Sequence, residues 1–362
     1  MTYLVVSDLH CHRWSLFSKV DADGVNSRLR MILNELERAA RELVIAGGNV
    51  MVIAGDIFHV RGSVSPEVLN PVQESMRRIL DMGIYIYAIP GNHDLSGEET
   101  DALGSSIQTL GETNSHLANI FVANRPVLRE NLAFVPWISD KKTLLDTIEE
   151  LAKQAELHHN YKPNEMDLFI HAGLDDVLPN MPSQGLTAKK LSSFGFKRVF
   201  AGHYHNHKDL GLGVYSIGAS THQTWSDVGS RAGYLMVEAD KVTFCDTKAP
   251  KFIDVSGMSE EDMGLVIPGN YVRLRGSAMT IPEIKELREF FGLNGALGIS
   301  IQVAKAVVSA RGSAPTAGVT IIDSISAYID SATDFASGID RDRVKVDCAD
   351  VIAKVGQVLE EA

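Results

Sequence analysis

Short apolar segments that end in polar, ligand-like residues dominate roughly the first 250 positions of the chain. Fully apolar runs such as residues 50–54 are typical of strands covered on both faces of a sheet. Between these runs lie segments with helical spacing of apolar residues, such as 26–43. The alternation predicts a layered α/β domain, and open α/β sheets place their functional sites just beyond strand ends.

The expected elements of this domain follow from the same patterns. Asn26 or Ser27 can cap the first helix, and Gly47 and Gly48 end it. We expect strands at residues 3–6, 50–54, 84–89, 132–136, 168–170 and 198–201, helices at 26–43, 66–82 and 141–158, and closing antiparallel strands at 214–217, 233–238 and 241–245.

The sequence patterns in the last third of the chain predict parts that are separate from the main domain. Residues 248–251 form a plausible boundary, and a strand, a helix and a strand are expected at 271–274, 282–291 and 298–303. A Gly/Ser/Pro-rich stretch at 309–318 precedes two helical segments, 322–336 and 344–361. We therefore expect three parts: a main domain at 1–250, an α/β module at 251–318 and a helical segment at 319–362.

Charge and cysteine content narrow the class of protein. The net charge of −12 excludes a global basic field that would attract nucleic acid, although a local groove and metal ions can still supply positive charge. Cys11, Cys245 and Cys348 are few, odd in number and far apart, which fits reduced thiols rather than a disulfide framework. With no signal-peptide pattern and no long apolar stretch, we expect a cytoplasmic protein that does not enter a membrane.

Five polar blocks carry the candidate chemistry. Aspartate, histidine and asparagine are oxygen and nitrogen ligands suited to manganese, zinc or iron. Because neighbouring strands lie about 4.8 Å apart, ligands at their ends can reach two metals roughly 3.5–4 Å apart, with one carboxylate as a bridge. The blocks are Asp8-Leu9-His10, Gly55-Asp56, Gly91-Asn92-His93-Asp94, His171-Ala172-Gly173 and Gly202-His203-Tyr204-His205.

Together and in order, these blocks resemble the signature of calcineurin-like metallophosphoesterases. The resemblance covers roughly residues 1–245 and implies a β-sandwich flanked by helices that binds two divalent ions, manganese first, with zinc, iron or magnesium as alternatives. It implies that Asp56 bridges the ions, that His93 lies over the phosphate and that Asp94 orients the His93 ring. The implied ligands are Asp8, His10, Asp56 and His205 for one ion, and Asp56, Asn92, His171 and His203 for the other.

A narrower resemblance is carried by the sequence Gly55-Asp56-Ile57-Phe58-His59. It is similar to the form found in SbcD-type nucleases of double-strand-break repair, in which a histidine like His59 lies near the scissile strand. In that group an α/β module caps the active site, C-terminal helices bind the coiled coil of an SbcC-type ABC ATPase, and helices of the phosphoesterase domain form a homodimer. The resemblance implies a DNA exonuclease or endonuclease, in a chain short enough for a viral or otherwise minimal version.

Two other functions are compatible with the residues. A phosphodiesterase for cyclic nucleotides or other small molecules would use the same metal chemistry, although such enzymes often need no capping module. A non-catalytic assembly subunit of the same fold would bind no metal. Outside the implied ligands, we expect structural or surface roles for Cys11, His12 and His207.

Overall fold

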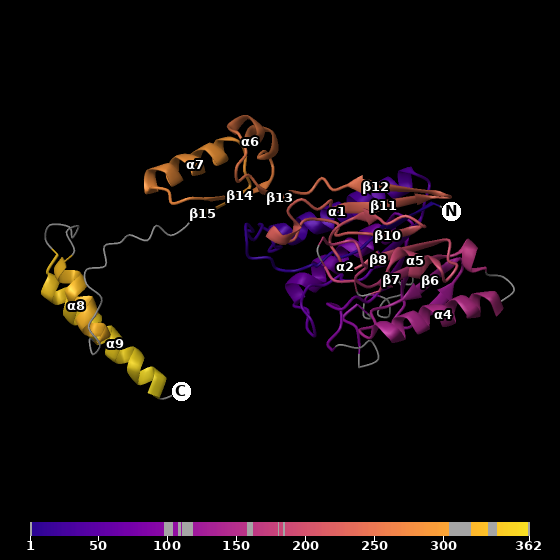
Figure 1. Cartoon of the computed structure of the whole chain (residues 1–362), viewed down its shortest axis with the longest axis horizontal. Coiled ribbons are helices and arrows are strands. Elements are labelled where there is room, and N and C mark those ends of the chain that lie inside the picture. The colour runs from indigo at the N-terminus through magenta and orange to yellow at the C-terminus, as the bar shows by residue number, and fades with distance from the viewer. Residues whose placement is uncertain are drawn as a thin grey trace. The chain divides into compact units, whose positions relative to one another are not determined.

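The computed structural model describes residues 2–97, 104–107, 110, 119–157, 162–179, 181–183, 185–303, 320–331 and 339–360, with side chains of the last range up to 352. The chain divides into two compact units, Met1–Ala304 and Lys305–Ala362. In Figure 1 the strands and most helices belong to the first unit, and α8 and α9 belong to the second.

The first sheet of the larger unit is mixed. Its central strands are parallel, and β11 runs antiparallel to both β1 and β12. The six strands lie in the order β12 (Lys241–Asp246), β11 (Gly233–Glu238), β1 (Thr2–Val6), β2 (Val50–Ala54), β3 (Tyr85–Ile89) and β4 (Ile120–Val122).

The second sheet is also mixed, with β6, β7, β8 and β10 parallel and β5 and β9 antiparallel at its edges. Its order is β5 (Val127–Arg129), β6 (Leu132–Val135), β7 (Asp167–His171), β8 (Arg198–Gly202), β10 (Val214–Ser216) and β9 (Lys208–Asp209).

Successive side chains of each strand point to opposite faces of the sheet and so pack into separate hydrophobic cores. In β1, Tyr3 and Val5 face the second sheet, whereas Leu4 and Val6 pack under the helices on the outer face. Helices α1 (Ser27–Ile45) and α2 (Pro66–Asp81) cover the first sheet, and α4 (Lys141–Leu157) and α5 (Ala188–Ser192) cover the second (Figure 1). The result is a four-layer α/β/β/α sandwich, as the sequence predicts.

Asn26 shows why α1 begins where it does. Its side-chain oxygen accepts hydrogen bonds from the backbone N–H groups of Arg28 and Leu29, which have no partner within the helix. The predicted cap is therefore confirmed. The 3-10 turns at Pro163–Glu165 and Trp225–Asp227 complete the loops of this domain.

A third, parallel sheet forms the α/β module that the resemblance identifies as the capping module. Strands β13 (Phe252–Asp254), β14 (Tyr271–Gly276) and β15 (Gly298–Val303) pair in that order. Helices α6 (Glu260–Val266) and α7 (Ile281–Leu293) pack on it around Phe291, which is fully buried. The predicted strand–helix–strand unit is present, and it is preceded by β13 and α6, which the sequence patterns did not predict.

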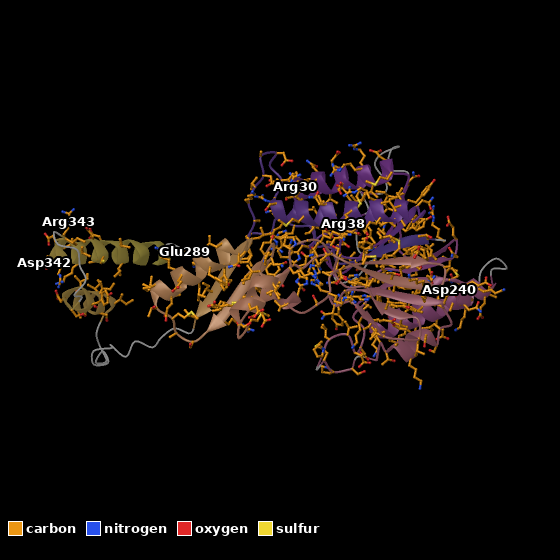
Figure 2. The ribbon with its side chains drawn as sticks, turned by 90° about the horizontal axis from the view of Figure 1, so that it is seen from above. Arg30, Arg38, Asp240, Glu289, Asp342 and Arg343 are labelled. Carbon is orange, nitrogen blue, oxygen red and sulfur yellow. The ribbon has the colours of Figure 1, made fainter. Side chains whose placement is uncertain are left out.

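The smaller unit contains α8 (Ile321–Ser331) and α9 (Arg341–Glu360), which pack against each other. Asp342 and Arg343 mark the start of α9 in Figure 2. The predicted boundary at residues 318 and 319 lies outside the described residues. None of the helices described in either unit is long and apolar enough to span a membrane.

One predicted orientation is wrong. We expected residues 214–217 to form an antiparallel closing strand, but β10 pairs in parallel with β8. The chain leaves β8, forms the short edge strand β9 and turns back, so β10 inserts between β8 and β9. The apolar pattern of a strand is the same in either direction, and the two-residue β9 gives no pattern of its own.

Candidate dimetal centre

The two loops that carry Asp8, His10 and Asp56 run side by side beyond the ends of β1 and β2. The Asp8 N–H donates to the Gly55 carbonyl at 3.0 Å, and the His10 N–H donates to the Asp56 carbonyl at 2.9 Å. These bonds continue the parallel ladder past the strands. The side chains of the first two sequence blocks are therefore placed together by backbone pairing.

Four of the expected ligands have an unusual backbone. The φ angles of Asp8, His10, Asp56 and His203 are 52°, 47°, 54° and 105°. Residues other than glycine rarely adopt positive φ, and such strain gathers at functional sites, where the surrounding structure holds it. The fold therefore maintains a strained backbone at the residues whose side chains form the candidate site.

The first cluster consists of Asp8, His10 and His205, whose ligand atoms all lie within 4.8 Å of one another. The His10 Nε2 atom is 3.9 Å from Asp8 Oδ1. The Nδ1 atom of His205 pairs with Asp227 Oδ1 at 2.8 Å, which leaves Nε2 for the cluster. Carboxylates that hold the second nitrogen of a metal-binding histidine fix its tautomer and ring orientation.

The second cluster consists of Asp56, His171 and His203, joined by the amide of Asn92. Asn92 Oδ1 lies 3.3 Å from His171 Nε2 and 3.0 Å from His203 Nδ1. The other nitrogen of His171, Nδ1, donates to the Ala54 carbonyl at 2.8 Å. The imidazole is thereby oriented with Nε2 toward Asp56, which is 3.3 Å away.

Asp56 lies between the clusters and contacts both. Its Oδ2 atom is 3.7 Å from His10 Nε2 and 3.3 Å from His171 Nε2. Its Oδ1 atom accepts the backbone N–H of His93 at 2.8 Å. This is the placement that a bridging carboxylate needs.

The surroundings of Asp56 leave no room for larger side chains. A Cβ atom on Gly91 would lie 2.1 Å from Asp56 Oδ1, and one on Gly55 would lie 2.1 Å from His171 Nδ1. The close approach of backbone to ligand therefore requires glycine at both positions. Carboxylate, amide and imidazole donors in two adjoining groups fit a pair of divalent cations.

The charges of the site follow from burial and from the carboxylates. Burial lowers the pKa of His10 to about 3, and burial with the nearby His171 lowers that of His203 to about 4. Burial also disfavours the charged forms of His171 and Asp56, but their attraction outweighs it. That attraction raises the pKa of His171 to about 9 and holds the pKa of Asp56 well below its usual range. Without metal, the site thus pairs an anionic Asp56 with a protonated His171, beside the uncharged rings of His10 and His203.

His93 and His59 border the first cluster. Their rings stack at 5.3 Å with an angle of 12°, and both converge on His10. The His93 Nδ1–H donates to the His59 carbonyl at 2.6 Å, so the His93 Nε2 atom is the free one. This pair places a group that can carry a proton and a second imidazole beside the first cluster.

The expected contact of Asp94 with the His93 ring is not formed. The Asp94 carboxylate accepts backbone N–H groups of Ile57, Phe58 and Gly91 at 3.3, 2.9 and 2.9 Å. Burial and the charge of Asp56 raise its pKa to about 7. Asp94 therefore ties the loops after β2 and β3 together, and the His59 carbonyl orients His93 instead.

The structure adds residues that the sequence analysis missed and places others where it expected them. Asp227 holds His205, and Trp137 packs at 5.1 Å from the His203 ring. The only signal for Asp227 is its place in the Thr224–Asp227 capping box, which indicates a helix start rather than a site. Cys11 is buried, and His207 bonds to the Ser216 carbonyl away from the clusters, as expected for structural residues.

Comparison with known proteins agrees with this geometry. The family model for calcineurin-like phosphoesterases matches residues 1–207. The chain is 22% identical over 233 residues to "Exonuclease subunit 1" of Enterobacteria phage T4, and the match spans 63% of this chain and 63% of that relative.

Two solved structures are also similar. A dimetal phosphatase from Danio rerio has 12% identity and a TM-score of 0.36, with 65% of this chain and 91% of that chain covered. A nuclease from Pseudomonas putida has 16% identity and a TM-score of 0.27, with coverage of 67% and 87%. At these TM-scores neither structure informs the chemistry of this chain.

Proposed function

The chain belongs to the calcineurin-like phosphoesterase family, and on that basis we propose that it is a two-metal phosphodiesterase that cleaves DNA, a nuclease of SbcD type. The observation that carries the proposal is the placement of Asp56 between two ligand clusters, with His59 and His93 beside them. The phage relative is named as an exonuclease subunit, which favours DNA over a small-molecule substrate.

The chemistry divides between the cations and the chain. Two bound divalent cations would supply a nucleophile at neutral pH and neutralise charge on the phosphoryl oxygens. Asp8, His10, Asp56 and His205 would hold one cation, and the second would share Asp56 and take Asn92, His171 and His203.

His93 and His59 act on the substrate directly. The Nδ1–H of His93 donates to the His59 carbonyl, so Nε2 is the nitrogen that, in the imidazolium form of the ring, gives a proton to the leaving oxygen. Such a general acid typically contributes about 10²–10⁴-fold to the rate. The stacked, half-buried ring of His59 positions the phosphodiester or its sugar.

Exposed apolar side chains on the smaller unit favour the binding of a protein partner. Apolar side chains of α8 and α9 are open to solvent: Ile321 is 71% exposed, Tyr328 69% and Val351 60%. Amphipathic helices with such residues bind apolar grooves and coiled coils. We include in the proposal an SbcC-like ATPase bound by these helices, a homodimer, manganese as the metal and a role in DNA repair, all as the resemblance implies.

Cleavage of end-labelled single- and double-stranded DNA with manganese tests the proposal. We expect His93→Ala to lower the rate by about 10²–10⁴-fold. His207→Ala is the matched control, because this half-buried histidine bonds to a carbonyl outside the clusters and should leave the rate unchanged. Cleavage of a small chromogenic phosphodiester without cleavage of DNA would replace the DNA substrate by a small molecule, and equal rates in both variants would contradict the role of His93.

A further inference from the structure

Arg28, in the first turn of α1, is buried and forms no ion pair with a described carboxylate. It is 4% exposed, and the ion pairs found among the described residues do not include it. Its Nη2 atom donates to the Gln223 carbonyl at 2.6 Å, and its Nη1 atom donates to the Leu16 carbonyl at 3.3 Å. A buried charge normally requires pairing, and the attraction of the nearby Asp227 carboxylate is not a direct ion pair, so other groups around the guanidinium must also stabilise it.

Three aromatic rings surround the guanidinium. Its central carbon lies 4.8 Å from the ring centroid of Trp14, 5.1 Å from Phe252 and 5.6 Å from Tyr271. These distances are within the roughly 6 Å over which a cation is attracted to an aromatic face. Phe252 and Tyr271 belong to β13 and β14 of the capping module, whereas Trp14 lies in the loop after β1. Arg28 thus joins the module to a loop of the catalytic domain.

Trp14, which contacts Arg28, also contacts a residue of the candidate active site. Its ring packs 4.6 Å from the ring of His59, and its indole N–H donates to the His10 carbonyl at 3.3 Å. The Asn26 side chain donates to the Trp14 carbonyl at 2.9 Å, which fixes the backbone of Trp14. His59 therefore has an indole against it as well as the His93 and His12 rings.

Anchoring the module does not by itself require Arg28. Phe17 stacks on Tyr271 at 5.2 Å, and Trp225 packs edge-on against Phe252 at 4.8 Å. These apolar contacts join the same two parts of the chain and reach no candidate catalytic residue. The path from Tyr271 through Arg28 and Trp14 is distinct because it ends on His59.

We propose that Trp14 is a positioning residue for His59, and that Arg28 couples this position to the docking of the capping module. The inference rests on the proposed function for the role of His59 in cleavage. A change at the aromatic face of the module therefore alters the orientation of an imidazole that contacts the substrate in the proposed function.

A double-mutant cycle on DNA cleavage tests whether Trp14 acts through His59. We expect Trp14→Leu to lower kcat/KM by about 10- to 100-fold, the scale of a small misplacement of a catalytic contact. In a His59→Asn background the same substitution should change kcat/KM by less than about twofold. Trp225→Leu is the matched control, since Trp225 packs at the module interface without touching His59, and its effect should be the same in both backgrounds. Equal losses for Trp14→Leu in both backgrounds would overturn the proposal.

A second experiment tests the coupling to the module by substitution of Tyr271. It measures an NMR signal of His59 and does not depend on enzymatic activity. In the magnesium-loaded full chain, the imidazole Cε1–H signal of His59, assigned by its loss in His59→Asn, reports the ring current of Trp14. Tyr271→Phe keeps the aromatic face toward Arg28 and should leave this signal in place. Tyr271→Leu and Arg28→Met should move it in the same direction, and Arg231→Met, a solvent-exposed cation over Phe244, should not.

Together, the cleavage cycle and the NMR measurement distinguish failure of the inference from failure of the proposed function. If the chain does not cleave DNA but the His59 signal moves in Tyr271→Leu, the coupling holds and the substrate is wrong. If DNA is cleaved and the His59 signal stays fixed in both Tyr271→Leu and Arg28→Met, the coupling is refuted. If Arg28→Met does not fold, Arg28→Lys takes its place, because a lysine keeps the charge without the planar fork that contacts three rings.

Discussion

Asp227→Asn should weaken one of the two metal sites and spare the other. The carboxylate is 3% exposed and is fully used: Oδ2 accepts the backbone N–H groups of Gln223 and Thr224, both at 2.7 Å, and Oδ1 pairs with His205 Nδ1. An asparagine would keep its oxygen on the two backbone donors. Its NH₂ group would then face His205 Nδ1.

This arrangement changes the tautomer of His205. To accept from the amide, Nδ1 must give up its proton, and the proton then lies on Nε2, the nitrogen that faces Asp8 and His10. Loss of such an outer partner typically costs about 10- to 100-fold in metal affinity, or about 1.4–2.7 kcal/mol. Among the clusters formed by described residues, His205 belongs to that of Asp8 and His10 alone, so the effect should be confined to that site.

Calorimetric titration with manganese measures the effect directly. The wild-type chain should bind two ions, and Asp227→Asn should bind one ion normally and the other about 10- to 100-fold more weakly. Asp246→Asn is the control, because that carboxylate pairs with Arg231 at the surface. An unchanged titration, or equal weakening of both ions, would refute the reasoning.

Two further substitutions test the packing around the site. Gly91→Ala should abolish binding of both ions in the same titration, because the added Cβ would lie 2.1 Å from Asp56 Oδ1, and two tightly bound ions would contradict this placement. Asp167→Asn should lower the free energy of unfolding in urea by about 3–5 kcal/mol, because it breaks a buried bidentate pair with Arg198 at 2.7 and 2.8 Å. Asp240→Asn, in the exposed β11–β12 turn labelled in Figure 2, should leave the unfolding midpoint unchanged, and equal midpoints for the two variants would show that the buried pair is not stabilising.

The elements that hold the site were predictable because their sequences are unambiguous. Strands β1, β2 and β3 are short apolar runs followed directly by polar blocks, and parallel pairing brings those blocks to one edge. The ten site residues that the resemblance implies lie within one region of the structure.

The residue roles that could not be predicted from the sequence depend on long-range contacts. The role of Asp94 was expected to lie with its neighbour His93, but its carboxylate meets backbone donors 37 and 36 residues away at Ile57 and Phe58. Asp227 and Trp14 acquire their significance from the side chains that the fold places beside them. Local pattern carries no information about such partners, since a capping aspartate and a loop tryptophan are common without any site.

Anomalous X-ray diffraction from manganese-loaded crystals tests the central claim most directly. The account predicts two peaks on either side of Asp56, roughly 3.5–4 Å apart, one against His10 and His205 and the other against His171 and His203. A single peak, or two peaks that do not share the Asp56 carboxylate, would contradict a two-metal phosphodiesterase centre.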